Sequence, residues 1–138
     1  MGQARFVSKA VTQEIVVQVD STYIPDESAP DKDEYVFAYT VTIANHGRET
    51  VQLRSRHWII TDSDGKVEEV RGSGVVGAQP TLRPGQAFRY SSGCVLKTTS
   101  GSMHGTYQML REDGTSFDAA IAPFLLVAPT PEAKRYMN

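Results

Sequence analysis

The strictest pattern in the sequence is an alternation of side chains between residues 35 and 43. The odd positions carry only large apolar or aromatic residues, namely Tyr35, Phe37, Tyr39, Val41 and Ile43. Successive side chains of a β-strand point to opposite faces, so this run predicts a strand with one face in a core. The even positions carry no charge, which favours a central place in a sheet.

Similar but shorter runs, separated by turn residues, predict further strands along the chain. They cover Glu14–Tyr23, a segment from Val51 through Trp58, Lys66–Val70, Gln86–Ser92, Cys94–Leu96, Ser102–Leu110 and Thr115–Val127. Turns are expected at Asn45–Arg48, Asp62–Gly65, Leu82–Gly85 and Glu112–Gly114. No segment predicts a helix of ten residues or more. The fold class is therefore all-β, an immunoglobulin or fibronectin type III-like β-sandwich of seven to eight antiparallel strands.

Three details qualify these strands. Leu53 and Trp58 have opposite parity, so both can enter the core only if a β-bulge lies between them, which we place around residues 55–57. The pair Ser92-Gly93 is expected to interrupt its strand, and Pro123 predicts an edge position or a break. The acidic, proline-containing segment 24–34 is expected to be a solvated loop, and the tail beyond Pro129 to be frayed.

Length and composition exclude several classes of protein. The 138 residues fit one domain, with an ordered core of about residues 6–129, and no apolar run is long enough to span a membrane. Fourteen basic and sixteen acidic side chains give a net charge of -2, so we expect no nucleic-acid partner. A single cysteine, Cys94, and the lack of an apolar leader favour a reducing cytoplasm.

A glycine-rich segment offers the most inviting site. Gly72-Ser-Gly-Val-Val-Gly matches the dinucleotide fingerprint G-x-G-x-x-G, but Pro80 follows too closely for the required helix. Two interpretations remain. The loop amides, flanked by Arg71, Arg83 and Arg56, could hold an anion, or the glycines could serve a tight turn and close packing.

Other chemistry is not indicated. His46, His57 and His104 show no metal-ligand spacing, and Cys94 has no nucleophile signature around it. We therefore predict no catalytic residue, no metal and no cofactor. The aromatic residues alternate along strands, which is typical of core pairs rather than of a base-stacking platform.

Several short motifs together resemble the bacterial ApaG (CorD) family over about residues 6–129. They are Tyr35-Val-Phe-Ala-Tyr, Ser55-Arg-His-Trp, Val70-x-Gly-x-Gly-Val-Val-Gly, Gln79-Pro, Leu82-x-Pro-Gly, Tyr90-x-Ser-Gly, Met103-x-Gly-x-Tyr and Pro123-Phe. The chain departs from the pattern at Ala122, where proline is common. The resemblance implies a fibronectin type III-like sandwich, also found as a module in eukaryotic F-box and polymerase-interacting proteins. It implies an association with cobalt and magnesium tolerance but no known reaction.

The leading hypothesis is a non-enzymatic protein-interaction module in the cytoplasm, with an unidentified protein partner. The expected contact surface is the loop 72–80, above all Gly72, Gly74, Val75, Val76 and Gly77. Edge strands also allow a homodimer. The alternative is a small-ligand sensor that binds a phosphorylated nucleotide, pyrophosphate or a divalent cation at the same loop.

Overall fold

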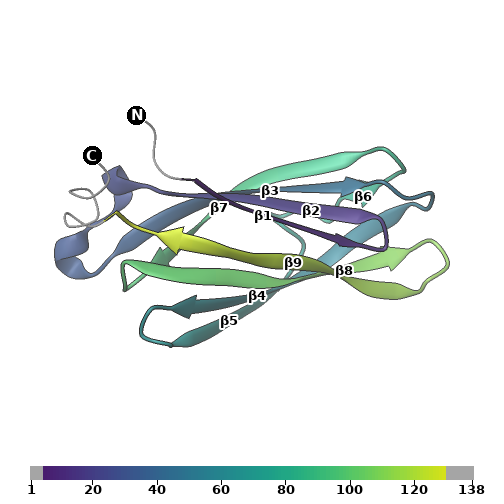
Figure 1. Cartoon of the computed structure of the whole chain (residues 1–138). Helices are drawn as coiled ribbons and strands as arrows, with labels where there is room; N and C mark the ends of the chain where they lie inside the picture. Colours follow the sequence, from purple (N-terminus) through teal and green to yellow (C-terminus); the bar gives the residue numbers. More distant parts are fainter. Residues whose placement is uncertain (1–4, 130–138) are drawn as a thin grey trace.

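A computed structural model describes residues 5–129 and shows two antiparallel sheets that face each other (Figure 1). The described residues form nine strands: β1 (Arg5–Thr12), β2 (Ile15–Tyr23), β3 (Tyr35–Asn45), β4 (Val51–Asp62), β5 (Val67–Ser73), β6 (Thr81–Leu82), β7 (Ala87–Leu96), β8 (Ser100–Arg111) and β9 (Ser116–Val127). Two short 3₁₀ helices, Pro25–Glu27 and Pro30–Lys32, lie in the acidic loop. The tail predicted to be frayed, residues 130–138, lies outside the described residues. The predicted all-β sandwich is confirmed.

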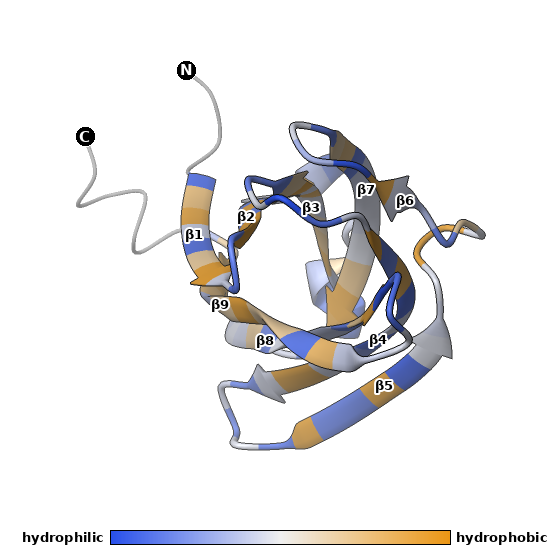
Figure 2. Ribbon diagram, turned by 90° about the vertical axis from the view of Figure 1, so that its right-hand side faces the viewer, coloured by the Kyte–Doolittle hydropathy of each residue, from blue (hydrophilic) through white to orange (hydrophobic). Residues whose placement is uncertain are grey.

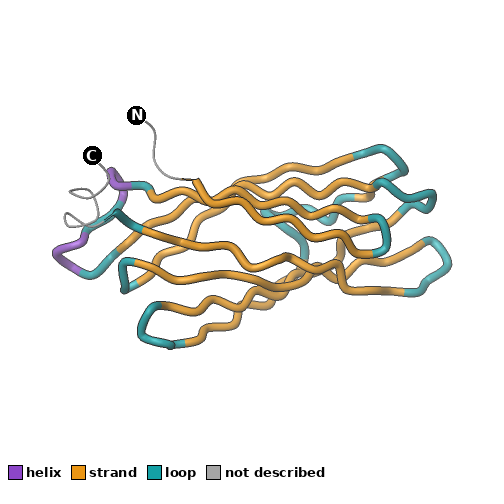
Figure 3. The backbone as a smooth tube through the Cα atoms, in the orientation of Figure 1, coloured by secondary structure: helices purple, strands orange, loops and turns teal. Residues whose placement is uncertain are grey.

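The sheets have the strand orders β1-β2-β3-β7 and β5-β4-β8-β9, and β6 pairs with β4. Strand β3 lies between β2 and β7, as its uncharged faces predict, and Phe37, Tyr39, Val41 and Ile43 are buried. The strands run along the long axis of the molecule, and most of the loops gather at its two ends (Figure 3).

Strand β4 contains the predicted bulge, but not at the predicted position. Its register with β8 shifts between Leu53 and Ser55, so the irregularity is at Arg54 rather than within residues 55–57. Leu53 and Trp58 are both buried as a result. The parity of Leu53 and Trp58 required a bulge between them but did not give its position. The position depends on which residue can point to solvent, and Arg54 is exposed.

One other strand prediction was wrong, and one strand was missed. Strand β7 runs without interruption through Ser92 and Gly93, because Gly93 lies opposite Ala38 in the ladder with β3. Strand β1 was not predicted at all. Its inward-facing residues alternate with exposed ones, but two of the four, Ser8 and Thr12, are polar, and the apolar Val7 and Val11 lie on the outer face, 52% and 62% exposed. Hydropathy therefore does not mark the buried face of this strand.

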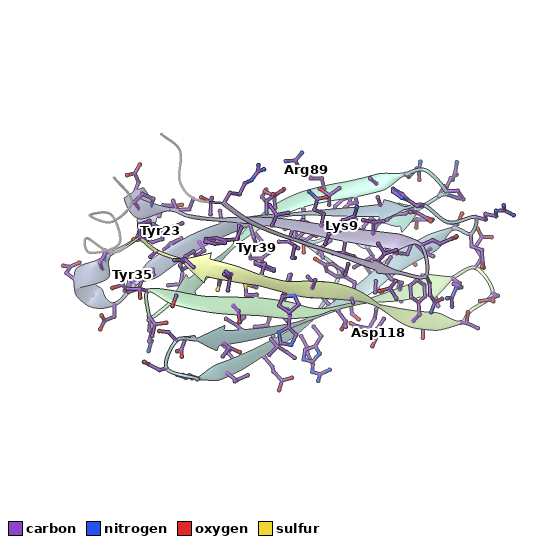
Figure 4. The ribbon with its side chains drawn as sticks, in the orientation of Figure 1. Lys9, Tyr23, Tyr35, Tyr39, Arg89 and Asp118 are labelled. Carbon is purple, nitrogen blue, oxygen red and sulfur yellow. The ribbon has the colours of Figure 1, made fainter. Side chains whose placement is uncertain are left out.

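The core is aromatic around the single tryptophan. The Trp58 ring meets Tyr39, Tyr107 and Phe124 edge-on, with ring centroids 5.4 to 6.2 Å apart. Tyr39, labelled in Figure 4, projects from β3 between the sheets. The hydroxyl groups of Tyr90 and Tyr107 hydrogen-bond each other across the sandwich. These contacts confirm that the aromatic residues belong to the core.

The two long sides of the sandwich differ. On one side the Ser8 and Ser21 hydroxyls donate to the Ala122 and Leu125 carbonyls of β9, at 2.9 and 2.7 Å. The Ala120 amide donates to Thr12 Oγ1 at 3.0 Å. Pro123 lies on this edge strand, as one of the two predicted alternatives has it; the strand does not break there, although its register with β8 shifts nearby. On the other side β5 and β7 lie well apart (Figure 2), which leaves the sandwich open there.

Candidate functional site

The glycine loop is a short hairpin turn at the end of β5. The Val75 amide donates to the Ala78 carbonyl at 2.8 Å, and the Ala78 amide donates back to Val75 at 2.9 Å. The two residues between them, Val76 and Gly77, have φ values of 43° and 80°. Positive φ at both central positions is the mark of a type I′ turn. No helix follows, in agreement with the position of Pro80.

Each glycine of the fingerprint has a structural reason. Gly74 has a φ of 62°, and a Cβ there would lie 2.3 Å from the Ala78 carbonyl oxygen. Gly77 supplies the second positive φ of the turn. Gly72 lies in the strand with ordinary φ, but a Cβ there would come within 2.8 to 2.9 Å of the Arg56 guanidinium. The geometry favours the interpretation as a tight turn with close packing.

The three arginines predicted to flank the loop do not converge. Arg56 Nη1 donates to the carbonyls of Ser73 and Gly74 at 3.0 and 2.8 Å, so its guanidinium holds the loop. Arg71 lies opposite His57 and is near Glu69, with its side chain 73% exposed. Because residues 56 and 57 are neighbours in one strand, Arg56 and Arg71 project from opposite faces of the sheet.

Arg83 lies beyond β6, in the turn that leads to β7, and its amide donates to Gln86 Oε1 at 2.9 Å. The loop amides of Gly74, Val75 and Ala78 also have carbonyl partners. The structure therefore brings only Arg56 to the loop, and much of the donor capacity that an anion would use is already engaged.

The two valines of the loop, which the sequence grouped together, have opposite environments. Val75 is 1% exposed and belongs to the core, whereas Val76 is 62% exposed at the tip of the turn. A β-branched residue with φ of 43° is uncommon, and the left-handed region costs an L-residue about 1–2 kcal/mol. Val76 is thus an exposed apolar side chain held on a strained backbone.

Beside Val76 the open side of the sandwich is hollowed. A hollow of about 220 Å³ is lined by Tyr39, Arg56, Trp58, Val75, Val76, Tyr90 and Ser92. Its neighbour, about 270 Å³, shares four of these residues and extends to Val70, Cys94 and Val95. Sequence reasoning missed this groove, because it arises from the separation of two sheets rather than from a motif.

Burial keeps the thiol and the phenol that line the groove neutral. Burial, together with the smaller effect of the nearby Glu68 carboxylate, raises the pKa of the Cys94 thiol to about 11. Burial also raises the pKa of the Tyr39 hydroxyl, against the effect of its hydrogen bond to Ser92. At neutral pH the groove therefore carries a protonated thiol and phenol, and Arg56 lines the same hollow.

Residues 5–129 offer neither a metal-binding cluster nor a membrane-spanning helix. No three His, Cys, Asp or Glu side chains lie together in a way that could hold a metal ion. His57 instead bonds Glu69 Oε1 through Nε2 at 2.7 Å. No helix in this part of the chain is long and apolar enough to cross a membrane.

Comparison with known proteins places this fold and loop in one family. The model of the ApaG domain matches residues 25–111. A Protein ApaG from Pseudomonas paraeruginosa is 56% identical over 84% of this chain and 92% of its own length. One from Brucella anthropi is 55% identical over 94% and 98%. A Bordetella pertussis crystal structure that carries the name ApaA is 50% identical, with a TM-score of 0.82 over 87% of this chain and 98% of that one. The chain belongs to the ApaG family.

Proposed function

We propose that this protein is a non-enzymatic interaction module that binds an apolar segment of a protein partner at the glycine loop and the adjoining groove. The observation that carries the proposal is Val76, which is 62% exposed at a φ of 43°. Asparagine or glycine would take that backbone conformation at lower cost. A strained, solvent-facing apolar residue suggests selection for a contact rather than for stability.

The surroundings of Val76 suit an apolar partner segment. The hollow beside it has aromatic walls from Tyr39, Trp58 and Tyr90, and the Arg56 guanidinium is already bonded to loop carbonyls. A partner side chain that enters the hollow would bury apolar surface against these walls. Strand β7, which lines the groove, also has a free edge that an extended segment could pair with.

The family resemblance extends this proposal to physiology. Under this proposal the module acts in the cytoplasm, and it influences cobalt and magnesium tolerance through its partner rather than through a metal site of its own.

Affinity capture with three proteins tests the proposal. We expect tagged wild-type protein to recover a partner from lysate and Val76→Glu to lose it, because a carboxylate would enter the apolar contact. Val11→Glu is the matched control, since Val11 on β1 is also 62% exposed. Equal recovery by both variants would contradict the loop as the contact surface. Val75 is unsuitable for this test because it is buried.

A phosphorylated ligand or a divalent cation at the same loop is the second hypothesis. The loop amides of Gly74, Val75 and Ala78 already donate to carbonyls, so a ligand would have to replace those bonds. Amide NMR spectra recorded during titration with pyrophosphate, diadenosine tetraphosphate or Co²⁺ distinguish this sensor hypothesis from the interaction module. Saturable shifts at Gly72, Gly74 and Gly77 would favour the sensor, and unmoved signals at about millimolar ligand would remove it.

A further inference from the structure

Strand β5 has a free edge. It pairs with β4 alone, and six of its seven residues are exposed. It contains no proline, and its pairing with β4 runs without a bulge. Such an edge is a template for another strand. We propose that two copies of this chain dimerise by antiparallel pairing of β5 with β5, centred on Val70.

The backbone groups that face outward follow from the hairpin geometry. The Asp62 amide donates to the Lys66 carbonyl, and the Gly74 amide donates to the Arg54 carbonyl. Backbone groups of successive residues alternate in direction, so the even-numbered residues of β5 face β4. The odd-numbered residues, including Glu69 and Arg71, therefore direct their amides and carbonyls toward the free edge.

The two-fold symmetry of a dimer restricts the register. Two identical antiparallel strands are related by an axis perpendicular to the sheet, so one residue must lie opposite its own copy. Centring on Glu69 or Arg71 would place like charges in direct contact. Centring on Val70 places Val70 opposite Val70 and Glu69 opposite Arg71, twice in each dimer.

The other face of the strand supports the same register. Glu68 then lies opposite Gly72 of the second copy, where the Arg56 guanidinium occupies the space that a side chain would fill. Glu68 does point to that face, because it lines the groove and raises the pKa of Cys94. Each dimer thus gains two Glu68 to Arg56 contacts on the inner face and two Glu69 to Arg71 contacts on the outer face.

The remaining edges do not offer this complementarity. Strand β9 meets the hydroxyl groups of Ser8 and Ser21, and the hydroxyl of Thr12 accepts its Ala120 amide. Strand β7 carries Arg89 as its single charged residue, and β1 carries only the basic Arg5 and Lys9, so self-pairing of either strand joins no opposite charges. Among these edge strands, β5 is the one whose charges are complementary to those of a second copy of itself.

Sedimentation equilibrium of the purified full chain tests the dimer. We expect reversible dimerisation that weakens as NaCl rises, because the charge pairs lie at a solvent-exposed edge. Glu69→Arg and Arg71→Glu each create two like-charge contacts per dimer, so each should weaken association at least about tenfold. The double variant E69R/R71E restores opposite charges and should restore association. Asp118→Arg, on β9, is the control and should leave it unchanged.

The register has its own test. Val70→Cys places two thiols opposite each other at the symmetry axis, so mild oxidation should give a covalent dimer rapidly. Glu69→Cys places each thiol opposite Arg71 and should crosslink slowly. Thermal melting of every variant checks that the fold is retained.

Monomeric wild-type protein at about 1 mM would overturn the proposal. The proposal would also be overturned if the single charge reversals had no effect on association, or if the double variant E69R/R71E failed to restore it. The interaction proposed for Val76 is independent of these outcomes, because neither the reversals nor the cysteines alter the loop tip.

Discussion

Replacing Val76 by asparagine should make the protein more stable. The change relieves a β-branched residue from a φ of 43° and creates the Asn-Gly pair that type I′ turns favour. Relief of the left-handed conformation is worth about 1–2 kcal/mol. Against this, the 62% exposure of Val76 means that about two fifths of its surface is buried, worth about 0.6–0.8 kcal/mol. The net gain is about 0.2–1.4 kcal/mol, or a rise of roughly 1–6 °C in Tm.

Thermal melting and urea titration of wild type and V76N measure this difference. Val11→Asn is the control, because Val11 is equally exposed but lies in a regular strand, where asparagine is disfavoured. It should lower stability by a few tenths of a kcal/mol to about 1 kcal/mol. A V76N protein that is less stable than wild type would show that Val76 contributes packing rather than strain. A more stable V76N protein that also loses the partner would indicate that the strain is retained for binding.

Three further changes probe the groove and its walls. Tyr107→Phe leaves the buried Tyr90 hydroxyl without its partner and should cost about 1–2 kcal/mol in urea titrations, whereas the double change Y90F/Y107F should cost less than the sum of the single changes. Gly72→Ala should displace the Arg56 guanidinium from the loop carbonyls and cost about 1–2 kcal/mol, with little added cost when Arg56 is already alanine. Iodoacetamide should alkylate Cys94 slowly at pH 8, with a rate that rises toward pH 11. Folding raises the pKa of this thiol from 9.0 to about 11, so its contribution to stability is full below about pH 9 and is lost as pH rises through 11. Fast alkylation of folded protein at pH 8 would contradict the burial of the thiol.

The strands that face the core were predictable from the sequence because their pattern comes from burial. Residues 35–43 alternate strictly, and every odd-numbered residue from Phe37 to Ile43 is buried. Strand β1 shows no alternation of apolar and polar residues. Two residues of its inward face, Ser8 and Thr12, are polar, and their hydroxyl groups hydrogen-bond β9. Parity required a bulge between Leu53 and Trp58 but could not choose its position, since any residue between them satisfies the count.

The candidate site was predictable as a segment but not as a surface. The glycines and Pro80 were enough to exclude a dinucleotide fold. Val75 is buried and Val76 is exposed because of the direction of one turn. The role of Gly72 depends on Arg56, which lies 16 positions earlier in the chain. The groove depends on how far β5 and β7 lie apart, which no local pattern records.

Site-specific photo-crosslinking at position 76 tests the interaction role most directly. Val76 is replaced by a photoreactive amino acid, the living cells are irradiated, and covalent adducts are separated by mass. A discrete adduct with a second protein, absent when the same group replaces Val11 on β1, is the expected result. The same adducts from both positions, or none from position 76, would contradict a partner-binding role for the glycine loop.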